Sequence, residues 1–162
     1  MYTFATHPYE HQQRVFDQSW QRPYFGLFME MGTGKSKVAI DTMGALYEAR
    51  EINTALIIAP KGVFDNWVKK EIPAHLHILV MNTEAFSTNK GASAAQRFIS
   101  LNPQCITILD ESTTIKNKSA QRTKNLIKVG QASKYRRILT GSPITKSPMD
   151  LFSQCAFLDT DA

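Results

Sequence analysis

The stretch GLFMEMGTGKSKVAI, residues 26–40, decides the fold because its character changes in the middle. An apolar run over 24–29 gives way to a glycine-rich segment, and apolar residues with helical spacing follow from Val38. Glycine weakens strands and helices alike, so the glycines mark a turn. The stretch therefore predicts a strand, a glycine loop and a helix, in that order.

Apolar runs alternate with helical patterns along the whole chain. Strands are predicted at 24–29, 55–59, 77–81, 105–109 and 135–140. Helices are predicted at 8–20, 34–49, 62–72, 91–101, 119–129 and 148–157. Strands that alternate with helices favour crossover connections and a mostly parallel sheet, and runs that are apolar throughout are typical of strands covered on both faces. The sequence therefore predicts an α/β fold.

The composition indicates a soluble, one-domain protein in a reducing compartment. The 162 residues suffice for one core, and 43% hydrophobic with 20% charged residues is typical of globular chains. No apolar run is long enough to cross a bilayer, and the N-terminus lacks a signal-peptide pattern. Cys105 and Cys155 are predicted to be buried thiols. We expect a location in the cytoplasm, the nucleoid or the nucleus, without secretion or a membrane partner.

Basic residues are concentrated in one segment. The net charge is +5, yet 112–137 holds eight basic residues and no acidic one. A polyanion partner is one interpretation of this segment, and a solvated helix face is the other. Charge alone does not separate the two.

The segment GTGKS, residues 32–36, predicts a phosphate cradle at the strand-to-helix turn. Glycines let backbone N–H groups face a phosphate, and the start of the helix adds partial positive charge. Lys35 can reach the β- and γ-phosphates, and the Ser36 hydroxyl can ligate Mg²⁺. We therefore expect ATP and Mg²⁺ as cofactors. The nucleotide-binding residues are predicted to be Gly32, Thr33, Gly34, Lys35 and Ser36.

An acidic pair follows the predicted strand at 105–109. Asp110 is predicted to hold Mg²⁺, and Glu111 to polarise the water that attacks the γ-phosphate. For the acidic pair alone, a helix N-cap with an acidic first turn is the alternative. Together with the phosphate cradle, the pair favours hydrolysis, with Lys35, Asp110 and Glu111 as the catalytic residues.

A polar turn follows the last predicted strand. Its residues are Thr140, Gly141 and Ser142, ahead of a proline. The hydroxyls are predicted to sense the γ-phosphate or to link the nucleotide site to nucleic acid, and a plain turn is the alternative reading. In open parallel sheets, ligands lie beyond the carboxyl ends of the strands, so this turn is a candidate part of a ligand site.

These segments together resemble the first RecA-like lobe of superfamily II helicases, and most closely the Swi/Snf-like DNA translocase ATPases. Residues 29–36, 55–72, 78–86, 110–117 and 139–158 resemble motifs I, Ia, Ib, II and III, and 8–20 resembles the adenine-side Gln motif. The resemblance implies a RecA-like P-loop NTPase, a three-layer sandwich, with one helicase ATP-binding domain over 1–162. It also implies that Gln12 lies at the adenine, that the strand of motif III lies between those of motifs I and II, and that Leu139 lies beside both.

The resemblance also implies a nucleic-acid partner. Pro60, Lys61 and Thr83 are expected to contact the phosphate backbone of one strand of DNA, which the resemblance favours as duplex. Ser112 and Thr113 stand where the family has Ala-His, so a hydroxyl at Ser112 would take over part of the coupling to motif III.

The family's second RecA-like lobe, with its arginine fingers, is not within these residues. We expect it in the same longer chain or in another subunit, and we expect this lobe alone to bind ATP·Mg²⁺ but to hydrolyse it slowly, since such fingers accelerate related reactions about 10³- to 10⁵-fold. Two alternatives remain. One is a nucleotide-responsive DNA- or protein-binding module with little turnover, and the other is a different P-loop ATPase such as a packaging motor.

Overall fold

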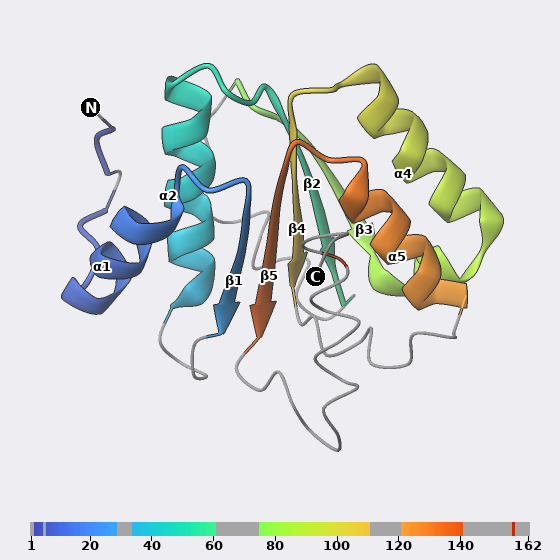
Figure 1. Cartoon of the computed structure of the whole chain (residues 1–162), viewed down its shortest axis with the longest axis horizontal. Coiled ribbons are helices and arrows are strands. Elements are labelled where there is room, and N and C mark those ends of the chain that lie inside the picture. The colour runs from blue at the N-terminus through green and yellow to red at the C-terminus, as the bar shows by residue number, and fades with distance from the viewer. Residues whose placement is uncertain are drawn as a thin grey trace.

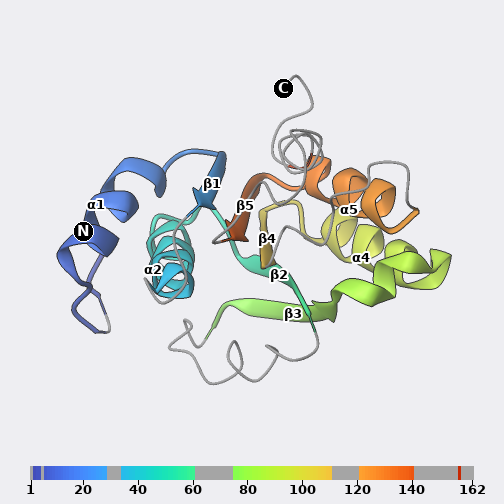
Figure 2. The same cartoon turned by 90° about the horizontal axis from the view of Figure 1, so that it is seen from below.

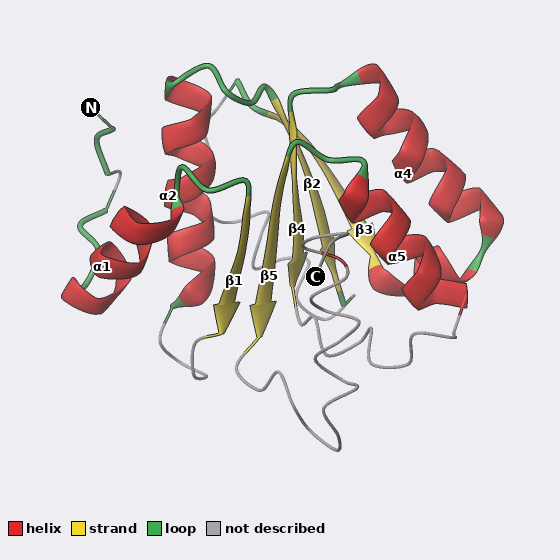
Figure 3. Cartoon of the chain, in the orientation of Figure 1, coloured by secondary structure: helices red, strands yellow, loops and turns green. Residues whose placement is uncertain are grey.

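A computed structural model describes residues 2–4, 6–28, 34–60, 75–110, 121–140 and 157, leaving aside the side chains of Phe28, Lys35 and Thr140. The elements in these ranges are shown in Figure 1 and, by type, in Figure 3. They are α1 (Glu10–Ser19), β1 (Tyr24–Phe28), α2 (Lys35–Glu48), β2 (Thr54–Ala59), β3 (His77–Asn82), the 3₁₀ helix η2 (Thr83–Ser87), α4 (Asn89–Leu101), β4 (Cys105–Asp110), α5 (Gln121–Gln131) and β5 (Tyr135–Thr140).

The five strands form one sheet in the order β1-β5-β4-β2-β3, and every pairing among them is parallel. Helices α1 and α2 cover one face of the sheet, and α4 and α5 cover the other (Figure 2). The predicted α/β fold with three layers is therefore confirmed. The predicted strands and the helices at 8–20, 34–49, 91–101 and 119–129 agree with the structure to within a few residues. The predicted helices at 62–72 and 148–157 lie outside the described residues, except Phe157.

The core is centred on β2, whose side chains are all buried. Successive strand residues point to opposite faces, and β2 uses both. Ala55 and Ile57 pack into the cluster under α1 and α2, whereas Leu56 and Ile58 pack into the cluster under α4 and α5. This double burial explains why the strand is apolar throughout, as the sequence pattern predicted.

The composition also gave expectations about the two cysteines and about membrane-spanning segments. Cys105 is fully buried at the start of β4, as predicted, and burial raises the pKa of its thiol. Cys155 lies outside the described residues. No helix in the described part of the chain has the length and apolar character needed to cross a membrane.

A buried arginine joins β5 to the end of α1. Arg137 is fully buried, and its guanidinium donates to the carbonyls of Ser19 at 2.8 Å and Pro23 at 3.2 Å. Burial lowers the pKa of Arg137 to about 10, so the side chain stays charged at neutral pH. A cation at helix C-terminal carbonyls is favourable. Arg137 therefore fixes the C-terminal end of α1 against the sheet.

Candidate nucleotide and nucleic-acid site

The strand register brings the ends of β1, β5 and β4 to one edge of the sheet. Leu139 of β5 pairs with Leu27 of β1 on one side and with Asp110 of β4 on the other. The expectation that the motif III strand lies between the other two is therefore confirmed. Neighbouring strands are about 4.8 Å apart, so the backbones of Leu27 and Asp110 are separated by about 10 Å across β5.

The glycine turn ends in a conformation that favours glycine. Gly34 has φ 75° and ψ 41° and serves as the N-cap of α2, which begins at Lys35. A Cβ built on Gly34 would lie 2.1 Å from Nε2 of Gln12. The first N–H groups of a helix have no partner within the helix and carry partial positive charge. The start of α2 therefore presents partner-free N–H groups next to Gly34, the last residue of the predicted cradle before Lys35.

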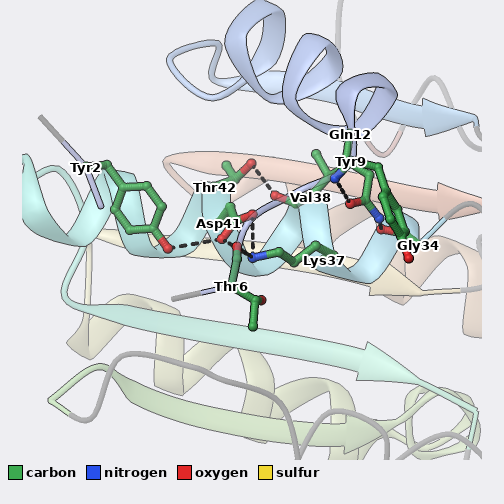
Figure 4. Close-up of polar contacts among 9 residues, drawn as sticks. All are labelled: Tyr2, Thr6, Tyr9, Gln12, Gly34, Lys37, Val38, Asp41 and Thr42. Atoms are coloured by element: carbon green, nitrogen blue, oxygen red, sulfur yellow. Dashed lines mark hydrogen bonds and ion pairs between the residues drawn. The ribbon is translucent and has the colours of Figure 1, made fainter. Parts of the chain in front are cut away.

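Gln12 of α1 lies directly against this turn (Figure 4). Its side chain is buried, its Nε2 donates to the Gly34 carbonyl at 3.3 Å, and its Oε1 accepts from the Tyr9 backbone N–H at 2.9 Å. The structure thus brings together two of the predicted nucleotide-binding residues. Sequence reasoning placed Gln12 at the adenine and missed its contact with Gly34, since residues 22 positions apart carry no periodic signal.

A polar network beside the turn was also missed. The buried Asp41 pairs with Lys37 at 3.0 Å and accepts from the Tyr2 hydroxyl at 3.1 Å, and Lys37 donates to the Thr6 carbonyl at 2.8 Å (Figure 4). The spacing of Lys37 and Asp41, four residues apart on α2, was the available signal. The network fastens the N-terminal segment onto the first half of α2.

The structure describes both residues that were predicted to bind the magnesium ion. Ser36, in the first turn of α2, and Asp110, at the end of β4, are both partly buried. Hydroxyl and carboxylate oxygens are the hard ligands that Mg²⁺ prefers, so this pair fits the ion. Within the described ranges there is no group of three or more His, Cys, Asp or Glu side chains placed to hold a metal.

Several predicted site residues lie outside the described residues. They are Gly32, Thr33, Lys61, Glu111, Ser112, Gly141 and Ser142. For Lys35 and Thr140 the backbone is described and the side chain is not. Their chemical roles stay predictions, as do those of the other predicted site residues.

The ends of β2 and β3 form the neighbouring part of the same edge. Ala59 pairs with Asn82, so Pro60 and Thr83, which follow them, leave the sheet side by side. Thr83 is 2% exposed, and its hydroxyl has no hydrogen-bond partner among the described residues. It begins η2, a helix that the sequence pattern did not predict. A phosphate contact by this hydroxyl would therefore require the side chain to become exposed.

The basic segment divides into structural and exposed residues. Arg136 is buried and lies 4.5 Å from the ring centroid of Tyr24, and Arg137 is the buried anchor of α1. Lys134 pairs with Glu51 at 3.1 Å. On α5, Lys124 and Lys128 are exposed. Part of the basic segment therefore stabilises the fold, so fewer of its charged side chains are exposed to a polyanion.

Comparison with known proteins points to one group of relatives. Residues 92–162 match the family described as the SNF2-related domain. The bovine (Bos taurus) "DNA annealing helicase and endonuclease ZRANB3" is 29% identical over 145 residues, covering 77% of this chain and 13% of that protein. "Protein CHROMATIN REMODELING 24" of Arabidopsis thaliana is 24% identical and covers 92% of this chain and 17% of that protein.

A solved structure shows the same fold. The Sulfolobus solfataricus SWI2/SNF2 ATPase core in complex with double-stranded DNA superposes with a TM-score of 0.80 at 22% identity, covering 98% of this chain and 37% of that one. Over these ranges the chain is similar to SNF2-related proteins in sequence, and it has the fold of a SWI2/SNF2 ATPase core. It spans less than a fifth of the length of either curated relative described above.

Proposed function

We propose that this chain is the ATP-binding lobe of a DNA-dependent ATPase, a helicase or a double-stranded DNA translocase of the Swi/Snf type. In this proposal residues 1–162 form one helicase ATP-binding domain. A second RecA-like lobe, in the same longer chain or in another subunit, completes the catalytic site. ATP and Mg²⁺ are the cofactors, and duplex DNA is the partner.

The register of the sheet carries the proposal. It ends β1, β5 and β4 along one edge, with Phe28 beside Thr140 and Leu139 beside Asp110, in the order that the family resemblance implies. Ligands of parallel sheets lie at this edge. The start of α2 would hold the triphosphate, and Ser36 and Asp110 would hold Mg²⁺. The metal would neutralise charge that develops on the phosphates.

The other residues of the site have complementary roles in this scheme. Lys35 pairs with the β- and γ-phosphates, and Glu111 orients and deprotonates the attacking water. Ser112, Thr140, Gly141 and Ser142 pass the state of the γ-phosphate to the nucleic-acid side. Pro60, Lys61 and Thr83 contact the DNA backbone, where contacts position the protein without reading sequence.

The names of the relatives support the DNA partner. They include an annealing helicase and a chromatin-remodelling protein, and the solved SWI2/SNF2 core was determined with double-stranded DNA. By analogy we infer that this protein works where chromosomal DNA is, in the nucleus or the nucleoid.

A nucleotide-responsive binding module with little turnover is the second candidate. The sequence itself favours the enzyme, because a protein that only binds nucleotide has no need of Glu111 next to Asp110. Comparing hydrolysis with binding separates the two candidates.

The test measures ATP turnover by the full protein with and without duplex DNA. Glu111→Gln should keep nucleotide binding and abolish hydrolysis, because the amide cannot accept the proton of the attacking water. Glu10→Gln makes the same chemical change at an exposed site on α1 and should leave turnover unchanged. A protein with both lobes that DNA fails to stimulate would remove the translocase reading. Unchanged turnover in Glu111→Gln would place the base elsewhere.

A further inference from the structure

A cavity lies between α1, α2 and the N-terminal segment. Its volume is about 470 Å³, within the range of small-ligand pockets. The residues that line it are Tyr2, Phe4, Gln13, Phe16, Asp17, Trp20, Ala45, Glu48 and Ala49. Positions 13, 16, 17 and 20 fall on one face of α1 and its C-cap, and 45, 48 and 49 on one face of α2 and its C-cap.

Four of the nine residues that line the cavity are aromatic. Phe16 and Trp20 stack with planes 10° apart, and Phe4 meets Phe16 edge-on with centroids 5.2 Å apart. The Tyr2 hydroxyl is held by Asp41, which fixes that ring in place. Ala45 of α2 and Ala49, the C-cap of that helix, also line the cavity, and their small side chains leave room for a ligand between the helices.

The polar groups that line the cavity are acidic or neutral. Asp17 and Glu48 are exposed, one on each helix, and neither has an ion-pair partner among the described residues. Among the described residues, no basic side chain lines the cavity. Outside it, the ammonium of Lys37 lies 5.8 Å from the ring centroid of Phe4 and is paired with Asp41. The rings thus already attract one ammonium from outside the cavity.

We infer that this cavity binds the alkylammonium side chain of a lysine presented by a basic partner peptide. Aromatic faces attract cations through the ring quadrupole, the aliphatic stem of lysine packs well on apolar surface, and the carboxylates of Asp17 and Glu48 supply complementary charge. A neutral apolar side chain would fill the same walls but would leave both carboxylates without a partner.

The cavity is distinct from the proposed nucleotide site. Ala45 comes eleven residues after Gly34 in the chain, and a helix rises about 1.5 Å per residue, so the wall of the cavity at Ala45 lies about 16 Å along α2 from Gly34. The peptide titration needs no nucleotide, so its result does not depend on ATP binding.

The experiment titrates the full protein with a capped pentapeptide that has lysine between glycines, and with the same peptide carrying norleucine in place of lysine. Binding is followed by NMR through the indole N–H of Trp20. We expect the lysine peptide to shift this signal and to bind at least about ten-fold more tightly than the norleucine peptide. The double variant Asp17→Asn, Glu48→Gln should weaken lysine-peptide binding by about ten-fold, since each exposed charge pair contributes modestly.

Glu10→Gln is the matched control, because it removes one carboxylate from the same helix outside the cavity. It should change the affinity by less than about two-fold. Equal binding of the lysine and norleucine peptides would overturn the inference. So would undiminished affinity in the double variant, or a lysine peptide that leaves the Trp20 signal unmoved at millimolar concentration.

Discussion

The carboxyl edge of the sheet has two halves that are built differently. The nucleotide half comprises the ends of β1, β5 and β4, and the nucleic-acid half comprises the ends of β2 and β3. In the first, a glycine with positive φ and a helix N-terminus present backbone groups. In the second, Thr83 is buried with an unpaired hydroxyl at the start of a 3₁₀ helix. In the described residues, the first half thus presents backbone N–H groups at the start of a helix, whereas the threonine of the second half is buried.

The largest expected effect is on ATP hydrolysis, and it should be confined to the nucleotide half. Lys35→Ala should lower the rate of ATP hydrolysis about 10³-fold, because an ion pair at about 4 Å and an effective dielectric of about 20 contributes about 4 kcal/mol. DNA binding without nucleotide should be unchanged. Turnover assays and duplex binding by anisotropy measure the two quantities. The control Lys90→Ala removes an exposed lysine from α4 and should alter neither. Loss of DNA binding in Lys35→Ala would show that the halves are not separable.

The second effect tests how far the nucleotide half is preformed. Gly34→Ala should lower the free energy of unfolding by about 1–2 kcal/mol, because an alanine in the left-handed region is strained, and its Cβ would meet the Gln12 amide at 2.1 Å. Nucleotide affinity should fall with it. Urea unfolding and nucleotide titration measure these changes.

A double variant divides that effect into its parts. Gln12→Ala with Gly34→Ala removes the collision and leaves the backbone strain, so the two substitutions should be less than additive. Additive losses would mean that Gln12 moves aside freely and does not constrain the turn.

The third effect probes the nucleic-acid half. Thr83→Val replaces a buried, unpaired hydroxyl by a methyl group of similar shape and should raise the free energy of unfolding by up to about 1 kcal/mol. If the hydroxyl meets a phosphate in the complex, duplex affinity should fall at the same time. Thr123→Val, at another buried threonine on α5, is the control for the substitution itself. A less stable Thr83→Val protein would show that the hydroxyl has a partner in the folded chain.

The difference between the two halves also explains which features of the structure could be predicted from the sequence. The glycine turn was predictable because phosphate chemistry demands residue types that ordinary helices and strands avoid, as Gly34 with its positive φ shows. The strands were predictable because double-sided burial makes β2 and β4 apolar throughout. The order of the strands came from the family resemblance, since periodicity in one strand carries no information about its neighbours.

Contacts between distant side chains were not predictable in the same way. The bond from Gln12 to Gly34 and the anchoring of α1 by Arg137 depend on tertiary packing. In the sequence, Arg137 is one more member of a basic segment, and only its burial shows that it serves the fold. The burial of Thr83 likewise depends on η2, whose five residues are too few for a helical pattern to stand out.

The smallest expected effect lies at the opposite edge of the sheet and serves as a reference for both halves. Hydrogen bonds from Lys134 and Tyr135 lower the pKa of the Glu51 carboxyl. A carboxyl whose pKa is lowered in the folded state stabilises the fold at pH values above the ordinary glutamate pKa, and that contribution is lost as the pH falls through the folded-state pKa.

Below pH 4.5, the ordinary pKa of glutamate, the wild-type protein should therefore lose more stability than Glu51→Gln, which cannot take up this proton. Urea midpoints at neutral and acid pH measure the difference, with Glu84→Gln on η2 as the control. Because the pair is largely exposed, solvent screening keeps the change small, and equal acid sensitivity of wild type and Glu51→Gln would show that the pair contributes nothing to the fold.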